Sequence, residues 1–453
     1  MSPRTVVKKI VPRKLFKTIE PYGHLGEAVF LNSLNNGSPA RGMKVIGVTG
    51  TNGKTTTCFL IHRMLHEAGY KVGLMTTVAY GAGDNIKPQI EHMTTASVPT
   101  LIKRMQELKQ EGVEWLVLEV TSHALAQHRV WGVPFSVAVM TNVTEEHLDY
   151  HGTFENYRNA KRQLFKLANK NKKGLRIGVV NAEDPSAELF AGDIKNPVTY
   201  GVKKGDLRAE EVNLTPAGST YKVKISSDNY NIVCHLPGSF NVYNTMAAIG
   251  VGRAVGLNPE QIEKGIAALK TVEGRMVTVD ESQNFGVIVD YAHTPDSFEK
   301  VFKGIKPLVK GKLIVVFGSA GRRDEKKRAV QGALAGKYAD LVFITEEDDR
   351  DMDGAAIMEE IAAGAIKAGK TKGRNLLLIH KREEAIKAAL KAAQKDDVVL
   401  LLGKGHEKSI LSNGPKAAEL RRLQQDDNDP RRVAERPYNE VEVARAALKS
   451  LKS

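Results

Sequence analysis

Residues 44–57, which read KVIGVTGTNGKTTT, constrain the fold more than any other part of this 453-residue chain. The run 44–48 is short, apolar and rich in β-branched residues, which is typical of a buried parallel strand. Gly50 and Gly53 then bracket a loop, and a helix is expected over 55–67. A glycine-rich loop at a helix N-terminus presents backbone N–H groups and the positive end of the helix dipole to an anion. This segment therefore predicts a phosphate-binding loop.

The residues after the second glycine indicate that the phosphates belong to ATP. Lys54 can reach terminal phosphates, and the hydroxyl of Thr55 can ligate Mg²⁺. The spacing departs from G-x-x-x-x-G-K-[ST], because Val48 takes the place of the first glycine and the loop begins at Gly50. An ordinary glycine turn before a helix is the alternative. We expect ATP and Mg²⁺ as cofactors.

Composition narrows the class of protein. Hydrophobic residues make up 42% of the chain, and no run of about 18 apolar residues is present, so we expect no transmembrane segment. No secretory signal is visible, and Cys58 and Cys234 are too few for a disulfide framework, so we expect a cytoplasmic protein. The net charge of +14 comes from basic residues scattered among acids. Anionic small substrates account for this charge, and we expect no nucleic-acid partner.

The pattern along the chain predicts an α/β fold in three parts. Residues 1–42 form a short basic extension, either a solvated helix packed on its own domain or a basic amphipathic segment for an anionic surface. Over 43–270, strands alternate with helices, which predicts a central ATP-binding domain with a mostly parallel sheet. The alternation restarts over 271–453, which predicts a Rossmann-like C-terminal domain. We also expect an antiparallel side sheet within 198–236 and a mobile loop over 412–436.

Three chemically active side chains follow predicted strands of the central domain. Glu119 ends the strand WLVLEV, and a carboxylate at that sheet edge can hold Mg²⁺, although a lone Glu there more often caps the next helix. His147 follows the next strand, and Lys161 lies on an amphipathic helix ten residues past His151. Together they suggest a second cation site.

Seven motifs occur in one order along the chain: TGTNGKTTT, LEVTSHALAQHRVWG, TNVTEEHLDYHGTFENYRNAKRQLF, GSFNVYNTMAAI, EGRM, DYAHTPDS and GKGHE. In this order they resemble the Mur ligases, and most of all the MurE group, which adds the third amino acid to the UDP-MurNAc-dipeptide of peptidoglycan. The resemblance covers residues 44 to about 448. It implies a monomeric ATP-dependent ligase of cell-wall synthesis, in which an acceptor carboxylate is phosphorylated and an amine then displaces phosphate.

The resemblance also implies roles for individual residues. Those implied for ATP are Gly50, Thr51, Asn52, Gly53, Lys54, Thr55, Thr56, Asn241, Asn244, Arg275 and Asp290. The metal ligands implied are Thr55, Glu119, His147 and Lys161, with Lys161 carbamylated, and the catalytic set is Lys54, Glu119, His147 and Lys161. The muramyl-peptide acceptor is implied to contact Thr94, Thr95, Ser122, Gln127 and Arg129. The pocket for the incoming amino acid is implied to contain Arg323, Arg350, Gly403 and Glu407.

Three departures from the family pattern bear on the substrates. Only about 42 residues precede the first strand, whereas the usual uridine-binding domain needs roughly 100, so we expect that domain to be reduced or missing. The family's GGDRD is replaced by residues 320–324, AGRRD, which adds a positive charge. Its DNPR tetrad falls on residues 347–350, EDDR, so Arg350 is retained within an acidic loop. The amino acid added is therefore a diamino acid, with diaminopimelate and lysine both open.

Two other functions are consistent with parts of the sequence. One is another ligase of the superfamily, similar to folylpolyglutamate synthase, and HLDYHG and SHALAQHRV argue against it. The other is a non-catalytic ATP-binding scaffold. The presence of Lys54, Glu119, His147 and Lys161 argues against it, because a scaffold does not need two metal sites.

Overall fold

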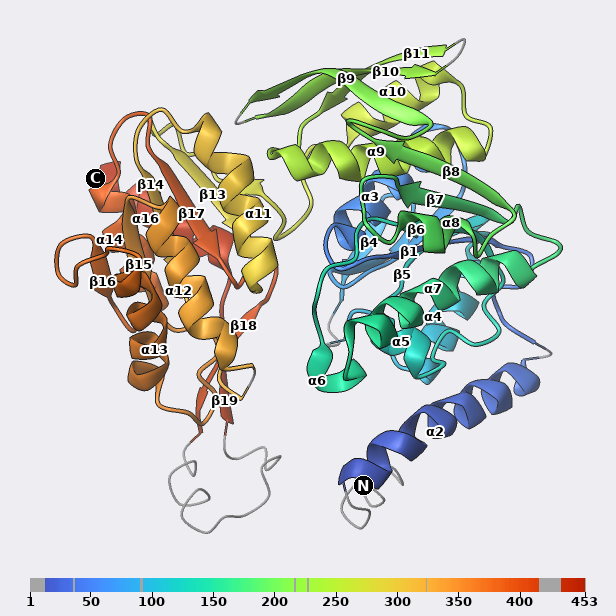
Figure 1. The fold of residues 1–453 in the computed structure, drawn as a ribbon, viewed down its shortest axis with the longest axis horizontal. Coiled ribbons are helices and arrows are strands. Elements are labelled where there is room, and N and C mark those ends of the chain that lie inside the picture. Colours follow the sequence, from blue (N-terminus) through green and yellow to red (C-terminus); the bar gives the residue numbers. More distant parts are fainter. Residues whose placement is uncertain are drawn as a thin grey trace. The chain divides into compact units, whose positions relative to one another are not determined.

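The structure is a computed structural model, and it describes residues 13–35, 37–89, 93–215, 217–225, 228–322, 324–414 and 433–452 (Figure 1). The chain divides into two compact units, and the boundary near the middle of the chain lies between Lys270 and Thr271. The first unit contains an eleven-stranded sheet and the second a six-stranded sheet, and helices connect the parallel strands at the centre of each. This arrangement confirms the predicted α/β fold class.

The sheet of the first unit has the strand order β11-β10-β9-β8-β7-β6-β1-β5-β2-β3-β4. Its strands are β1 (Lys44–Thr49), β2 (Val72–Met75), β3 (Ala79–Ala82), β4 (Asn85–Pro88), β5 (Trp115–Glu119), β6 (Phe135–Met140), β7 (Ile177–Asn181), β8 (Asn196–Gly201), β9 (Leu207–Thr215), β10 (Gly218–Ile225) and β11 (Asp228–Cys234). The central strands pair in parallel, and β1 lies between β5 and β6. Antiparallel pairs, β3 with β4 and β10 with β11, close the two edges.

The helices of the first unit are α2 (Arg13–Leu34), α3 (Lys54–Glu67), α4 (Val98–Gln110), α5 (Ser122–Ala126), α6 (Leu148–His151), α7 (Phe154–Lys170), α8 (Ala187–Ala191), α9 (Ser239–Ala254) and α10 (Pro259–Ala268). Helix α3 packs against α9 and α10, while α5 packs against α7. Buried apolar residues of β1, β5 and β6 form the core with α4 and α7. This core fixes the strand ends from which the candidate site is built.

The antiparallel pairing predicted within 198–236 is confirmed for β10 with β11, but these strands extend the main sheet and do not form a side sheet. Strand β8 pairs in parallel with β7, and Val198 lies opposite Val179, so the main sheet continues into β9, β10 and β11. The alternating pattern that suggested a side sheet has a local cause. In β10, Tyr221 and Val223 point into the protein while their neighbours are exposed, because only one face of these outer strands is covered.

The second unit has the sheet order β12-β13-β17-β14-β15-β16. Its strands are β12 (Val277–Thr278), β13 (Gly286–Asp290), β14 (Leu313–Phe317), β15 (Leu341–Ile344), β16 (Leu376–Leu378) and β17 (Val398–Leu402). Its helices are α11 (Pro295–Ile305), a 3₁₀ turn η1 (Lys306–Leu308), α12 (Lys326–Tyr338), α13 (Gly354–Lys367), α14 (Arg382–Ala392) and α16 (Glu440–Lys452). All pairs in this sheet are parallel except β12 with β13.

The expected loop at 412–436 begins and ends in regular structure. Strands β18 (Ser409–Asn413) and β19 (Val433–Pro437) pair in antiparallel register, with Ser412 opposite Ala434. The prediction of a mobile loop is therefore wrong for the two ends of this segment, where backbone pairing orders the chain, and residues 415–432 lie outside the described residues.

The structure bears on two predictions from composition, the absence of a disulfide framework and the absence of a transmembrane segment. Cys58 and Cys234 are both buried, and neither forms a disulfide within the described residues. Among the helices that the structure describes, none is long and apolar enough to cross a membrane.

Candidate active site

The predicted phosphate loop connects β1 to α3 at the carboxyl edge of the first sheet. Val48 pairs with both Glu119 of β5 and Val139 of β6, so the ends of three parallel strands meet at this loop. Gly53 caps α3 with φ 84°, the left-handed region that glycine tolerates best. The carboxyl edge of a parallel sheet is where open α/β folds bind ligands.

Close packing leaves no room for side chains at the two loop glycines. A Cβ on Gly50 would lie under 3.0 Å from Thr141 Oγ1, and one on Gly53 equally close to Asn244 Oδ1. Asn244 belongs to α9 and donates to Asn241 Oδ1 at 2.8 Å, and both amides are buried. Asn241 and Asn244, implied as adenine contacts, thus lie together, with Asn244 directly behind the phosphate loop.

The rest of the loop is held by side chains that follow β6. Thr51 N donates to Asn142 O at 2.7 Å, and Asn52 N donates to Asn142 Oδ1 at 3.1 Å. Thr141 Oγ1 donates to Asn52 O at 2.6 Å. Thr56, also implied in ATP binding, is buried in the first turn of α3. These bonds fix the loop backbone before any phosphate arrives.

Two lysines converge on one carbonyl of the loop. Lys54 Nζ donates to Gly50 O at 3.1 Å and to Thr51 O at 2.8 Å. Lys161 Nζ, from α7, donates to the same Gly50 O at 2.6 Å. The structure therefore brings Lys161 to the phosphate loop across 111 residues of sequence.

Lys161 has unusual electrostatic surroundings. Its side chain is 1% exposed, and its ammonium lies 4.5 Å from the centre of the Tyr157 ring. Burial, and then the charge of Lys54, lower the pKa of Lys161 well below its usual value, although Glu146 and Glu119 oppose the shift. A lysine in this state holds a larger share of neutral amine, which is the form that reacts as a nucleophile.

Glu119 lies beside the first turn of α3. Its Oε2 accepts from Thr55 Oγ1 at 3.0 Å and from both the backbone N and Oγ1 of Thr77 at 3.0 Å. The Glu119 residue is 1% exposed. A threonine hydroxyl and a carboxylate are the oxygen donors that Mg²⁺ prefers, so this pair fits the implied metal.

His147 is the N-cap of α6 and lies in the left-handed region, with φ 55°, an uncommon conformation for a residue with a side chain. Its Nε2 lies 3.8 Å from Glu146 Oε1, and its ring centre is 4.7 Å from that of His123 and 6.3 Å from that of Tyr157. Since Tyr157 also contacts Lys161, His147 belongs to the same neighbourhood. Burial, followed by the neighbouring histidines, lowers the pKa of His123 to about 3.

The residues implied for the acceptor fall near β5 and α5. Thr95 Oγ1 donates to Glu119 O at 3.0 Å, and Ser122 Oγ lies 3.1 Å from His151 Nε2. Gln127 forms a side-chain hydrogen bond with Tyr150. Arg129 is buried and donates to the carbonyls of Thr95 and Ala96. The remaining member, Thr94, is half-buried in the same loop.

The other residues implied for nucleotide and amino-acid binding lie in the second unit. Asp290 ends β13, where it accepts from Met276 N at 2.9 Å and Ala292 N at 2.8 Å. Burial raises the pKa of Asp290, and Arg275 partly opposes this. Arg275 lies over the ring of Tyr291 at 4.7 Å. Asp290 and Arg275 are therefore neighbours within this unit.

A buried ion network occupies the end of β17, where the GKGHE motif lies. Lys404 Nζ, 1% exposed, donates to Asp348 Oδ1 at 2.9 Å and to Glu407 Oε2 at 2.6 Å. Burial opposes the charge, but Glu407 and Asp348 outweigh it and raise the pKa of Lys404. Tyr291 OH donates to Glu407 Oε1 at 3.3 Å. Glu407, expected to receive a substrate ammonium, thus already pairs with an ammonium of the protein.

Glu347 has no such partner. It is buried, and its Oε2 makes no hydrogen bond within the described residues. Gly403, with φ 107°, lies against it, and a Cβ on Gly403 would stand 2.7 Å from Glu347 Oε2. The implied amino-acid pocket therefore contains one carboxylate oxygen, Glu347 Oε2, to which no described residue forms a hydrogen bond.

Arginines surround the same acidic loop. Arg350, with φ 55°, donates from Nη1 to Gly321 O at 3.0 Å. Arg322 forms a two-point ion pair with the buried Asp351. The positive charge that AGRRD adds at Arg322 is therefore balanced by Asp351. Arg323, which was also implied for the amino-acid pocket, lies outside the described residues.

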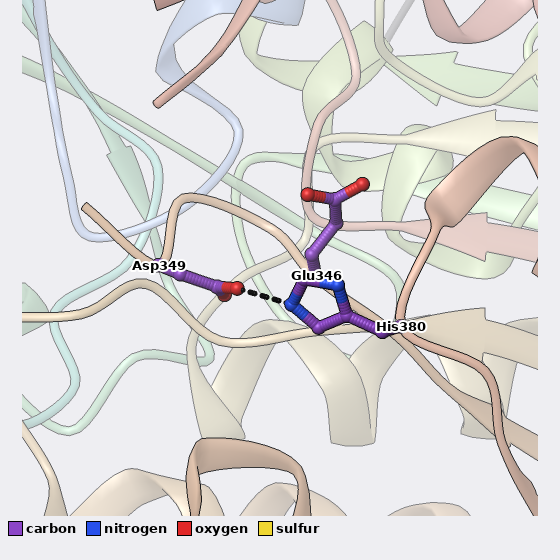
Figure 2. Close-up of side chains that lie close together, drawn as sticks. All are labelled: Glu346, Asp349 and His380. Carbon is purple, nitrogen blue, oxygen red and sulfur yellow. Dashed lines mark hydrogen bonds and ion pairs between the residues drawn. The ribbon is translucent and has the colours of Figure 1, made fainter. Parts of the chain in front are cut away.

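One cluster has ligand atoms close enough to hold a metal ion: Glu346, Asp349 and His380, whose ligand atoms lie within 4.8 Å of one another (Figure 2). His380 Nε2 lies 2.8 Å from Asp349 Oδ2. Glu346 Oε1, however, already pairs with Arg436 at 2.7 Å and accepts from the backbone N of Arg382. Since the acids have partners, we interpret the cluster as an ion-pair network.

Sequence reasoning missed several residues that complete the site. Thr77, Tyr157 and Lys404 were not singled out. Lys404 carries a usable signal, because it lies within GKGHE, one of the seven motifs in the sequence. Thr77 and Tyr157 carry none, since their roles depend on contacts across the sheet.

Comparisons with known proteins agree with this geometry. The family description "Mur ligase middle domain" matches residues 48–252, and "Mur ligase, glutamate ligase domain" matches residues 274–405. The chain is 43% identical over 403 residues to the UDP-N-acetylmuramyl-tripeptide synthetase of Roseiflexus sp., covering 85% of this chain and 79% of the relative.

Two further relatives are similar over most of the chain. A UDP-N-acetylmuramoyl-L-alanyl-D-glutamate–2,6-diaminopimelate ligase of Geobacillus thermodenitrificans is 42% identical over 375 residues, covering 82% of this chain and 76% of the relative. A solved structure of a ligase with the same name has a TM-score of 0.64 at 26% identity, covering 96% of this chain and 83% of that one.

Proposed function

Because this chain belongs to the Mur ligase family, we propose that it is an ATP-dependent ligase that adds a diamino acid to a UDP-MurNAc-dipeptide-like acceptor in peptidoglycan precursor synthesis. The observation that carries the proposal is the convergence of Lys54 and Lys161 on Gly50 O, with Glu119 bonded to Thr55 beside them. A loop that only bound nucleotide would not need a second, buried lysine.

Phosphoryl transfer is the first step. The free carboxylate of the acceptor attacks the γ-phosphate of ATP, the bond between that phosphorus and ADP breaks, and the products are an acyl phosphate and ADP. Lys54 and the N-terminus of α3 stabilise the negative charge that develops on the transferred group. Thr55 and Glu119 would hold Mg²⁺, which supplies further charge neutralisation when bound. The amine of the incoming amino acid then attacks the acyl carbon, and phosphate leaves as the amide forms.

Lys161 acts in the carbamylated form. Its lowered pKa supports this assignment, because only the neutral amine adds to CO₂, forming an N–C bond and releasing a proton. The resulting carbamate is an anion. An ammonium beside a metal site would repel the cation, whereas carbamate oxygens suit a hard cation. His147 would complete this second metal site.

The second unit selects the amino acid. The unbonded Glu347 Oε2 beside Gly403 supports recognition of an ammonium group, and Arg350 offers a planar fork for a carboxylate. Diaminopimelate carries both groups at its far end and lysine carries only the ammonium. We favour diaminopimelate, and we place the reaction in the cytoplasm, where ATP is available.

A phosphate-release assay tests the function. UDP-MurNAc-dipeptide is combined with ATP and either diaminopimelate or lysine, and folate is combined with ATP and glutamate. We expect release only with the muramyl acceptor and a diamino acid, and its loss in Lys54→Ala. Release with folate would support the folylpolyglutamate synthase-like alternative, and no release with any combination would support a scaffold.

A matched pair of variants tests Lys161. Lys161→Ala removes the buried amine, whereas Lys166→Ala removes a half-buried lysine five residues further along α7. We expect turnover to fall only in Lys161→Ala. Wild-type activity should also fall in CO₂-depleted buffer and return with bicarbonate. Full activity of Lys161→Ala would remove it from the mechanism.

A further inference from the structure

Helix α2 carries an apolar face that the protein leaves uncovered. Tyr22, Phe30 and Leu34 are 69%, 62% and 66% exposed, and Val29 on the same side is also exposed. These residues recur at intervals of about four and eight, which places them along one side of a helix. Large apolar side chains exposed singly are ordinary, but a row of them on one helix marks an interaction surface.

The opposite face of α2 anchors the helix to the first unit. Ala28 is fully buried with Val98 and Ile102 of α4, and Leu31 packs against them. Asn32 Nδ2 donates to the carbonyl of Trp131 at 3.3 Å. Tyr22, Phe30 and Leu34 therefore lie on the side of α2 that faces away from the first unit.

Nothing in the described part of the chain lies over this face. A Cβ built on Gly23 or Gly26, which lie between the apolar residues, would meet no atom within 4 Å. From Tyr22 to Leu34, Glu27 is the one acidic residue, and no lysine or arginine is present. The face is thus open and nearly free of charge.

The sequence that leads into this face is strongly basic. Residues 1–19 contain no aspartate or glutamate, and they include six basic residues: Arg4, Lys8, Lys9, Arg13, Lys14 and Lys17. Exposed aromatic and aliphatic side chains next to clustered basic residues are the combination by which a helix lies in an anionic membrane interface.

We propose that α2 docks this protein on an anionic phospholipid surface, with Tyr22, Phe30 and Leu34 entering the headgroup region and the positive charge of residues 1–19 adding electrostatic attraction. A second copy of this chain would be an apolar occupant of the face, but it would bring its own +14 charge. The basic segment would oppose that pairing, whereas it favours anionic lipid.

Vesicle co-sedimentation of the full chain tests this proposal. We expect binding to phosphatidylcholine vesicles that contain phosphatidylglycerol and little binding to phosphatidylcholine alone. At about 1 M salt, where screening acts over roughly 3 Å, binding should weaken sharply. Lys14→Glu with Lys17→Glu should lower the bound fraction at least about 25-fold, since each basic residue near the surface contributes roughly fivefold.

A matched pair of variants separates the apolar face from general stickiness. Tyr22→Ser, Phe30→Ser and Leu34→Ser together should lower vesicle binding more than roughly tenfold. Val330→Ser with Ile366→Ser, which changes two exposed apolar residues on helices of the second unit, should leave binding unchanged. Phosphate release in solution should be retained by all variants, which shows that each is folded.

Three results would overturn the proposal. One is equal sedimentation of wild type with neutral and anionic vesicles. Another is an equal loss of binding in the two serine variants. The third is absence of vesicle binding together with a wild-type dimer that the α2 serine variant abolishes, which would assign the face to a second copy.

Discussion

Replacing Gly53 with alanine should lower the turnover of ATP, because the new side chain would collide with Asn244. Gly53 has φ 84°, and an L-residue in the left-handed region costs about 1–2 kcal/mol. The new Cβ would also lie under 3.0 Å from Asn244 Oδ1, more than 0.4 Å inside ordinary contact at 3.4 Å. Asn244 cannot easily retreat, because it is buried and bonded to Asn241. The loop must therefore move.

The expected loss of activity follows from how strongly a reaction rate depends on the positions of the reacting groups. Misplacement by about 1 Å costs on the order of 100-fold in rate, so a shift of several tenths of an ångström should lower kcat/KM for ATP by at least about tenfold. Phosphate release at varied ATP concentration measures this loss, and urea unfolding measures the accompanying loss of stability.

Gly69→Ala is the matched control. Gly69 has φ 91°, and its added Cβ would meet nothing within 4 Å, so it carries the same backbone strain without the clash. We expect it to lower the free energy of unfolding by about 1 kcal/mol and to leave turnover unchanged. If the two variants lost activity equally, the close approach of Gly53 to Asn244 would not matter for ATP.

Four further outcomes follow from the structure. Lys161→Ala should lose most turnover and recover part of it with a short-chain carboxylate, and no recovery would argue against a carbamate. In CO₂-free buffer, the free energy of unfolding of the wild type should rise from neutral to alkaline pH. The pKa of Lys161 is lowered in the folded protein, so over this range the unfolded chain binds a proton at Lys161 that the folded chain does not. Lys161→Met should flatten this pH dependence, and an unchanged slope in that variant would contradict the prediction. Glu440→Ala should lower the free energy of unfolding by about 3–5 kcal/mol, measured by urea denaturation, since it strands the fully buried Arg382, and a loss below about 1 kcal/mol would show that the pair is not needed. Arg350→Ala should reduce turnover with diaminopimelate far more than with lysine, and equal losses would remove Arg350 from selection.

Short stretches of sequence predicted those helices, strands and turns that depend on interactions between residues close in the chain. The phosphate loop, the helix expected over 55–67 and the strand expected at WLVLEV follow from glycine placement and apolar runs, and the structure has them as the loop before α3, α3 itself and β5. The position of Glu119 followed as well, because carboxyl ends of neighbouring parallel strands must meet.

Pairings between distant segments could not be predicted in the same way. Whether β8 continues the main sheet depends on its hydrogen bonds to β7, and an alternating strand looks the same in a side sheet. The charge at Arg322 looked unbalanced because its partner, Asp351, lies on another loop. The hairpin of β3 and β4 was missed, since these strands have four residues each and carry little signal.

Transfer of ¹⁸O from the acceptor to phosphate is the most direct test of the ligase mechanism. The free carboxylate of UDP-MurNAc-dipeptide is labelled with ¹⁸O and converted with ATP and diaminopimelate, and released phosphate is analysed by mass spectrometry. An acyl phosphate intermediate requires that one carboxylate oxygen leaves with the phosphate. We predict one ¹⁸O atom in each phosphate molecule released, and unlabelled phosphate formed alongside the amide product would contradict the account.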